Sequence, residues 1–147
     1  MRFHWAASAA AFLFIVPSAL AQQAGAPAPF TGRDLSGTYA CTGVDGHEGA
    51  YTSTVTLEID KAQAHGRRAG YRFRMEVPNY GTYRGVAAAD GDRLAITFAH
   101  EDPATQDYGT GIAKVTTTKD GKARFDKFYY EEAYKGGNTG TESCVRN

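Results

Sequence analysis

The chain has 147 residues with 16 basic and 16 acidic side chains, and this zero formal charge argues against a general nucleic-acid binder, which needs a basic surface. Hydrophobic residues make up 42% and charged residues 22% of the chain, so it is not an intrinsically disordered protein. Its 17 glycines and nine tyrosines favour β structure over a helical bundle.

The chain begins with a predicted secretory signal peptide at 1–21. Its apolar stretch at 5–16 is too short to span a bilayer, and an Ala-Leu-Ala motif ending at Ala21 is typical of a cleavage site. The alternative is a buried N-terminal helix. We therefore expect a periplasmic or secreted protein, processed near Ala21, with no membrane span in the mature chain. A flexible tail rich in Ala and Pro is predicted at 22–33, followed by one domain at 34–147.

The rest of the chain alternates between apolar and polar residues with a period of two. Tyr71, Phe73 and Met75 share one face of a segment whose other face carries Arg72 and Arg74. This pattern is typical of antiparallel strands with one face in water. Eight strands are predicted, near 34–42, 50–60, 70–77, 80–88, 92–100, 107–118, 122–131 and 141–146. A polar connection, with room for one helical turn, is expected between the second and third strands at 61–70.

The segment at 123–135 has two interpretations. Phe125, Phe128, Tyr129 and Ala133 follow helical spacing. The Asp-Gly turn that precedes the segment and its aromatic side chains favour a strand. A helix here would change the fold to an α+β arrangement.

The two cysteines determine how the strands are arranged. Cys41 lies in the first predicted strand and Cys144 in the last, and an even number of cysteines in an exported chain favours a disulfide over two free thiols. A disulfide needs Cα atoms within about 7 Å, so these strands must be neighbours. We therefore predict an all-β fold, a closed eight-stranded antiparallel up-and-down barrel whose terminal strands are joined by the disulfide.

The start of the domain resembles a known group of barrels. The segment Leu35-Ser36-Gly37-Thr38-Tyr39 is similar to the Leu-Thr-Gly-x-Trp opening of avidin-type first strands, and Tyr39 takes the place of the Trp in the lipocalin Gly-x-Trp motif. The chain therefore resembles the calycin-like barrels, which include lipocalins and avidins, and this implies an eight-stranded barrel. No binding residues are carried over, because the mature chain lacks the tryptophans of the avidin pocket. Small exported barrels that inhibit lysozyme are also similar in size, export and disulfide use.

No sequence pattern predicts catalysis, a metal site or a cofactor. His47, His65 and His100 do not have the spacing of metal ligands, and the loop Asp45-Gly46-His47-Glu48 is better explained as a turn. The nucleophile elbow and the phosphate-binding glycine motifs are absent. A hydrolase or isomerase on a barrel scaffold remains a minor alternative.

Glycines within the predicted strands provide the candidate ligand-binding residues. The candidates are Tyr83, Gly81, Gly85, Gly109, Gly111 and Arg84. If the glycines face inward, they leave room beside Tyr83 for a neutral or apolar ligand, and a Gly85→Leu plug weakens binding with little loss of fold. If the other face points inward, Arg84 needs an anionic ligand or a buried acidic partner. Glycines that only let the barrel coil are the structural alternative.

Charge is uneven along the chain and bears on the partner. The segment at 61–84 contains six basic residues and one acidic residue, and the segment at 90–107 contains five acidic residues and one basic residue. The two segments either neutralise each other as neighbouring strands or leave a basic face for an anionic partner.

We expect an exported, non-enzymatic barrel that binds a small-molecule ligand. The alternative is a module that binds a periplasmic or secreted protein, or inhibits a secreted enzyme, through loops at 43–50 and 132–140.

Overall fold

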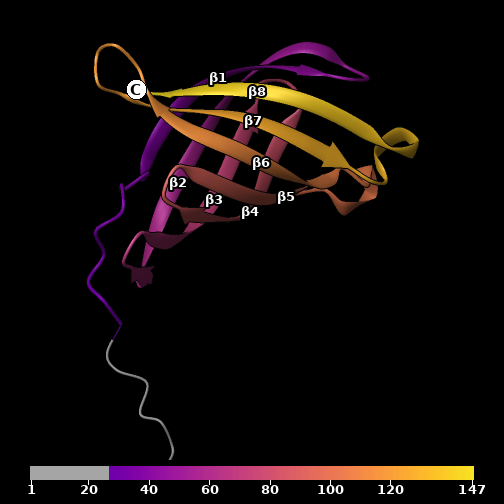
Figure 1. Ribbon diagram of the computed structural model, residues 1–147. Coiled ribbons are helices and arrows are strands. Elements are labelled where there is room, and N and C mark those ends of the chain that lie inside the picture. Colours follow the sequence, from indigo (N-terminus) through magenta and orange to yellow (C-terminus); the bar gives the residue numbers. More distant parts are fainter. Residues whose placement is uncertain (1–26) are drawn as a thin grey trace, which may run out of the picture.

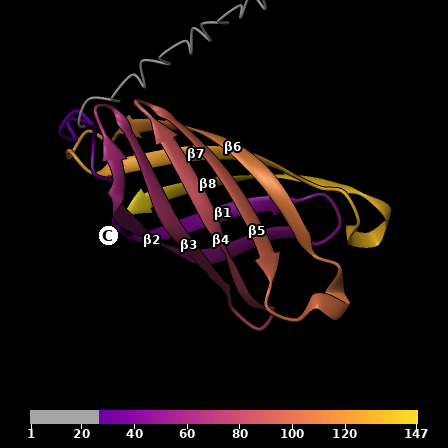
Figure 2. The ribbon, with the colours of Figure 1, turned by 90° about the horizontal axis from the view of Figure 1, so that it is seen from below.

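The computed structural model describes residues 27–147, which form eight antiparallel strands (Figure 1). The strands are β1 (Gly37–Asp45), β2 (Gly49–His65), β3 (Arg68–Val77), β4 (Gly81–Asp90), β5 (Arg93–His100), β6 (Tyr108–Thr117), β7 (Ala123–Glu131) and β8 (Asn138–Arg146). Each strand pairs with the next in sequence, and β8 pairs with β1, so the sheet closes on itself (Figure 2). The predicted closed eight-stranded barrel is confirmed. The predicted signal peptide at 1–21 lies outside the described residues.

The disulfide holds the seam where the two ends of the sheet meet. Cys41 on β1 lies directly opposite Cys144 on β8, and their sulfur atoms are 2.03 Å apart. The predicted bridge between the terminal strands is therefore confirmed. Because 103 positions separate the two cysteines, the bridge closes a long loop and restricts the unfolded chain.

The connection between β2 and β3 is much shorter than predicted. The polar connection expected at 61–70 is wrong, because β2 continues to His65 and β3 begins at Arg68. The register shifts between Asp60 and His65. Such an irregularity breaks the apolar–polar alternation, and the sequence of this extension is therefore indistinguishable from a polar loop.

The segment with two interpretations is a strand. In β7, Phe125 is buried and Phe128 is exposed, so the two rings lie on opposite faces of the sheet. The helical alternative for 123–135 is wrong, although the short 3-10 turn η2 (Tyr134–Gly136) follows the strand, and η1 (Pro103–Thr105) lies between β5 and β6. No helix in the described part of the chain is long and apolar enough to cross a membrane.

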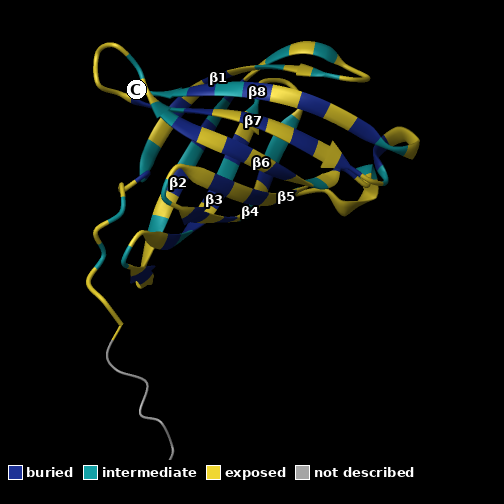
Figure 3. Cartoon of the chain, in the orientation of Figure 1, coloured by how far each residue is buried: buried dark blue, intermediate teal, exposed yellow. Residues whose placement is uncertain are grey.

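Buried and more exposed residues alternate along most of each strand, and the buried side chains form the interior of the barrel (Figure 3). At one end they close it. The Tyr39 hydroxyl donates to the Leu35 carbonyl at 2.7 Å, and its ring lies 5.1 Å from that of Phe125. The Arg146 guanidinium lies 5.7 Å from the Tyr39 ring. Both ends of the described chain lie at this closed end (Figure 1), and the opposite end holds a pocket.

The end of the segment predicted as a tail lies against the closed end. Phe30 bridges to Gly66 in the turn between β2 and β3 and packs against the core. Arg33 donates to the Thr116 carbonyl at 2.9 Å. These contacts tie residues 30–33 to the β2–β3 turn and to the end of β6.

Glycines lie beside large side chains of the neighbouring strand. Gly43 is paired with Tyr51 in the hairpin of β1 and β2, and Gly140 with Tyr129 in that of β7 and β8. A Cβ atom at either glycine would overlap the tyrosine ring. The glycines thus let each ring lie flat on the backbone of the adjacent strand, an arrangement that shields glycine in sheets.

The outer wall is electrically balanced. Exposed ion pairs cover it: Arg68–Asp90, Arg72–Glu58, Arg74–Glu76 and Arg84–Glu101. The first and last pairs join the basic and acidic segments that the sequence places on neighbouring strands. Two pairs thus join the basic and acidic segments, and Arg72 and Arg74 pair with acids outside the acidic segment, so these four arginines do not form an unpaired basic face.

Candidate functional site

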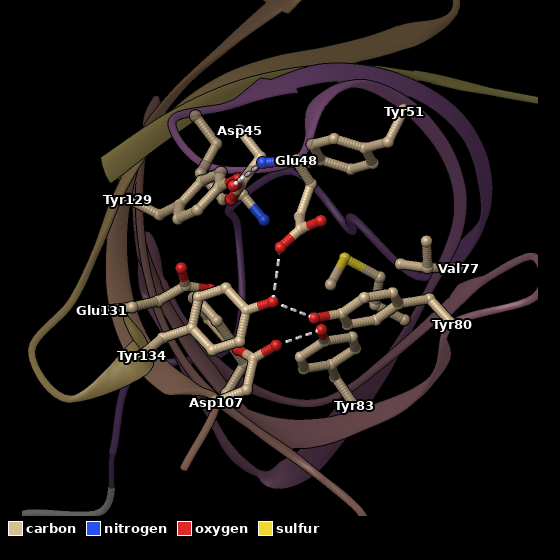
Figure 4. Close-up of a pocket in the computed structure, with 13 residues that line it drawn as sticks. Asp45, Glu48, Tyr51, Val77, Tyr80, Tyr83, Asp107, Tyr129, Glu131 and Tyr134 are labelled. Atoms are coloured by element: carbon tan, nitrogen blue, oxygen red, sulfur yellow. Dashed lines mark hydrogen bonds between the residues drawn. The ribbon is translucent and has the colours of Figure 1, made fainter. Parts of the chain in front are cut away.

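A pocket occupies the open end of the barrel, between the ends of the strands and the loops that join them (Figure 4). Its cavity volume is about 80 Å³. One water needs about 10–15 Å³ measured in this way, so the cavity can hold several waters or one small ligand group.

Six of the thirteen residues that line the pocket are aromatic. They are Tyr51, Tyr80, Tyr83, Phe98, Tyr129 and Tyr134. The Phe98 ring lies edge-on between its neighbours, 6.0 Å from Tyr83 and 5.9 Å from Tyr129. Phe98 is paired with Gly85 on one side and Gly109 on the other, and this register gives its ring the room to lie along the wall.

Four carboxylates also line the pocket: Asp45, Glu48, Asp107 and Glu131. Asp45 ends β1 and is fully engaged. One of its oxygens accepts from the backbone of the following turn, and the other accepts from the Tyr129 hydroxyl at 2.8 Å and from Asn138 at 2.6 Å. Burial acts to raise the pKa of Asp45, but these donors outweigh it and hold the pKa below its ordinary value.

Asp107 and Glu131 are the deeply buried pair. Asp107, just before β6, is 4% exposed, and its Oδ2 accepts from the Tyr83 hydroxyl at 2.5 Å. Its Oδ1 is buried and has no hydrogen-bond partner among the described residues. Glu131, at the end of β7, is 5% exposed and accepts from Asn138 at 2.5 Å. Burial, together with the charges of Asp107 and Asp45, raises the pKa of Glu131 to about 8.

Two loops meet across the mouth of the pocket. Tyr134, in η2, donates to Glu48 Oε1 at 2.7 Å and also contacts the hydroxyl of Tyr80 (Figure 4). Lys135 pairs with the same Glu48 carboxylate. These donors hold the pKa of Glu48 below its ordinary value. The β1–β2 turn and the β7–β8 loop are thereby joined into one rim.

An ion pair lies in the interior beneath the aromatic wall. The Lys127 ammonium is 2.6 Å from Glu142, and their side chains are 1% and 0% exposed. Glu142 also accepts from the Ser53 hydroxyl at 2.6 Å. The Lys127 ammonium lies 5.2 Å from the Tyr129 ring centroid and 5.4 Å from that of Phe98. The one cation that lines the pocket is thus already paired.

The structure separates the predicted ligand-binding residues. Tyr83 is buried and lines the pocket, whereas Arg84 is exposed on the outer wall and pairs with Glu101. The glycine face of β4 therefore points inward. Whether Tyr83 or the glycines contact a ligand stays a prediction.

The inward glycines do not leave an empty wall. A Cβ at Gly81 would overlap His100, one at Gly109 would collide with the Tyr130 carbonyl, and one at Gly111 would crowd the Lys127 side chain. At Gly85 it would collide with the Thr97 carbonyl of β5. The expectation that Gly85→Leu spares the fold is therefore wrong, because that glycine is needed for the backbones to approach.

Sequence reasoning missed the acidic and basic residues of the site. Asp45 and Glu48 were noticed only as turn residues, and Asp107, Glu131 and Lys127 were not singled out. Lys127 and Glu131 lie an even number of residues from Phe125 in β7, so they share its inward face. This alternation could have predicted both charged side chains in the interior. Among the described residues, the one cysteine–acid cluster with metal-ligand spacing contains Cys41 and Cys144, whose sulfurs form the disulfide.

Comparison with protein-family models, with curated proteins and with solved structures finds no match for this chain.

Proposed function

We propose that this protein is an exported, non-enzymatic binding barrel that holds a small molecule in the pocket at its open end. The observation that carries the proposal is a cavity with aromatic walls that is also lined by two buried carboxyl groups, Asp107 and Glu131, the first of which has an oxygen with no donor among the described residues. Ligand pockets typically combine apolar walls with a few buried polar groups that orient the ligand. A calycin-like identity, which the strand order supports, places ligands in the same part of a barrel.

Binding is favoured over catalysis by the way the polar groups are used. Burial and the nearby carboxylates raise the pKa values of Tyr83 and Tyr134, so these hydroxyls remain neutral donors. The Ser53 hydroxyl is committed to Glu142, and both sulfurs are committed to the disulfide. The hydroxyl and sulfur groups named here are therefore used in hydrogen bonds and in the disulfide, and the tyrosine hydroxyls act as neutral donors.

The proposal includes export with processing after Ala21. The disulfide supports it, because disulfides persist in oxidising compartments. Intact-mass measurement of the exported protein should give the mass of residues 22–147. A mass that includes residues 1–21 would overturn the processing site.

Native mass spectrometry of the exported protein tests the binding function. Val77 lines the pocket, whereas Val86 is 60% exposed on the outside of the next strand. We expect the wild type and Val86→Trp to retain a small molecule and Val77→Trp, which fills the mouth, to lose it. A wild type that retains nothing, or a Val77→Trp variant that still retains the molecule, would argue against this function.

Protein binding through the rim is the second candidate. The Glu48–Tyr134 bond and the Glu48–Lys135 pair hold the β1–β2 turn and the β7–β8 loop together, so they form one continuous surface. Co-purification of a partner chain that is lost in Lys135→Glu, but kept in Val77→Trp, would support this candidate over small-molecule binding.

A further inference from the structure

We infer that the ligand of this pocket is a small organic cation, an ammonium group on a short aromatic or apolar body, whose charged end lies between Asp107 and Glu131. The inference rests on the proposed function and names the chemical class of the ligand.

The first step is the unmatched acceptor. Asp107 lines the pocket and its Oδ1 is buried without a donor among the described residues, because the Tyr83 hydroxyl serves only the other oxygen of that carboxylate. A buried acceptor without a donor is costly, and more so when it is charged. A ligand ammonium supplies three N–H donors and the compensating charge.

The second step is the local charge. Of the side chains that line the pocket, four are carboxylates and one is a lysine. Lys127 is already paired with Glu142, and the Lys135 ammonium at the rim pairs with Glu48. Asp107 and Glu131 therefore face each other with no cation between them. A pocket with this excess of negative charge attracts cations and repels anions.

The third step is the aromatic wall, which already stabilises an ammonium group. Lys127 Nζ lies between 5.2 and 5.7 Å from the ring centroids of Phe73, Phe98 and Tyr129. Cation–π attraction acts within about 6 Å of a ring. Phe98 and Tyr129 also line the cavity, and Tyr83 adds a third ring beside Asp107. The body of the ligand would pack on these rings while its ammonium reaches the acids.

Without a bound cation, a proton offsets the negative charge of this pair. Burial and the interactions with Asp107 raise the pKa of Glu131 to about 8, so near neutral pH Glu131 is largely protonated. The other groups that act on Glu131 are Asn138, Asp45 and the tyrosines at 51 and 83. The pKa of Asp45 is lowered and those of the tyrosines are raised, so these groups do not titrate between pH 6 and 9. Cation binding must release the Glu131 proton.

Two consequences follow for binding. A primary alkylamine keeps its charge below about pH 9. Its affinity should therefore rise as the pH increases from 6 to 8, because less work is needed to remove the proton from Glu131. A neutral ligand of the same shape should show no such dependence.

The experiment titrates the purified protein, with its disulfide intact, with three probes of similar shape: 2-phenylethylamine, 2-phenylethanol and phenylacetate. Amide chemical shifts report the affinity and the location. We expect the amine to bind at least tenfold more tightly than the alcohol, the acid not to bind, and the amine affinity to rise at least tenfold between pH 6 and 8.

Matched variants test the two acids. Asp107→Asn and Glu131→Gln should each weaken amine binding at least tenfold while alcohol binding changes less than twofold. Glu131→Gln should also abolish the pH dependence. Glu132→Gln alters the next residue, which is exposed and accepts from Tyr108 on the outside, and should leave all affinities unchanged.

The outcomes separate the inference from the proposed function. Alcohol binding at the pocket that equals or exceeds amine binding, or amine binding that is independent of pH and of both acids, overturns the cation inference and leaves small-molecule binding standing. Failure of all three probes to shift pocket residues, in a protein that also retains no molecule on purification, overturns both.

Discussion

Removing one partner of the buried Lys127–Glu142 pair should be among the most destabilising single substitutions in the barrel. Lys127→Met keeps the length of the side chain but leaves the Glu142 carboxylate in the interior with only the Ser53 hydroxyl as a partner. Breaking a buried ion pair in this way costs about 3–5 kcal/mol of the free energy of unfolding. Because the two side chains are 1% and 0% exposed, water cannot screen the charge that remains.

The double substitution is the decisive comparison. Lys127→Met with Glu142→Gln removes both charges, and the Gln carbonyl can still accept from Ser53. We expect the double variant to lie within about 1–2 kcal/mol of the wild type, because an ion pair replaced by neutral groups of similar size is often nearly neutral. The coupling between the two positions would then be several kcal/mol.

Urea unfolding at pH 7, with the disulfide intact, measures these differences. A loss below about 1 kcal/mol in Lys127→Met, or a double variant that loses the sum of the single losses, would refute the reasoning.

Three further predictions concern the seam, the wall and the pocket. Cys41→Ser with Cys144→Ser should lower the free energy of unfolding by about 2–5 kcal/mol in urea titration, because it reopens a loop of 103 positions, and a loss below about 1 kcal/mol would contradict this. Gly85→Ala should abolish or severely weaken folding, measured by circular dichroism, since its Cβ collides with the Thr97 carbonyl. Gly70→Ala, whose Cβ would lie at an ordinary 3.5 Å from Gln63, should melt close to the wild type, and the reverse order would show that the backbone contact is unimportant. The melting temperature of Glu131→Gln should rise relative to that of the wild type as pH increases from 5 to 8. The folded pKa of Glu131 is raised from the ordinary 4.5 to about 8, so the wild type loses stability over that interval. Parallel curves for the wild type, Glu131→Gln and the control Glu132→Gln would contradict this prediction.

The strands and the closure were predictable because each depends on short-range or covalent information. The alternation in Tyr71, Phe73 and Met75 identifies a half-buried strand without any knowledge of its neighbours. The cysteines then convert a list of strands into a topology, since their bond requires the first and last strands to touch. The extension of β2 beyond Asp60 was missed because the register shifts there, and a shift erases the alternation on which the prediction depends.

The role of the strand glycines could not be deduced from one strand at a time. Gly109 and Gly111 do share the inward face, as their parity indicates. What fills the space beside them depends on the register with β5 and β7, which brings in Phe98 and the Lys127 side chain. For the β1–β2 hairpin this register could have been predicted. A short turn pairs Asp45 with Gly49, and counting back along both strands then pairs Gly43 with Tyr51.

The net charge of zero gave no indication of the charged residues in the pocket, because it sums the charges of the outer wall and the interior. On the outer wall five arginines pair with an acid on their own or a neighbouring strand, as in Arg72 with Glu58, and these exposed pairs contribute little stability. Inside the barrel the charges do not cancel, since Lys127 balances only Glu142 and leaves Asp107 and Glu131 without a cation. A net charge of zero is therefore compatible with a strongly acidic pocket. Because water screens the outer charges and not the inner ones, the proposed binding function makes the inner pair, rather than the outer wall, the group that would select the charge of the ligand.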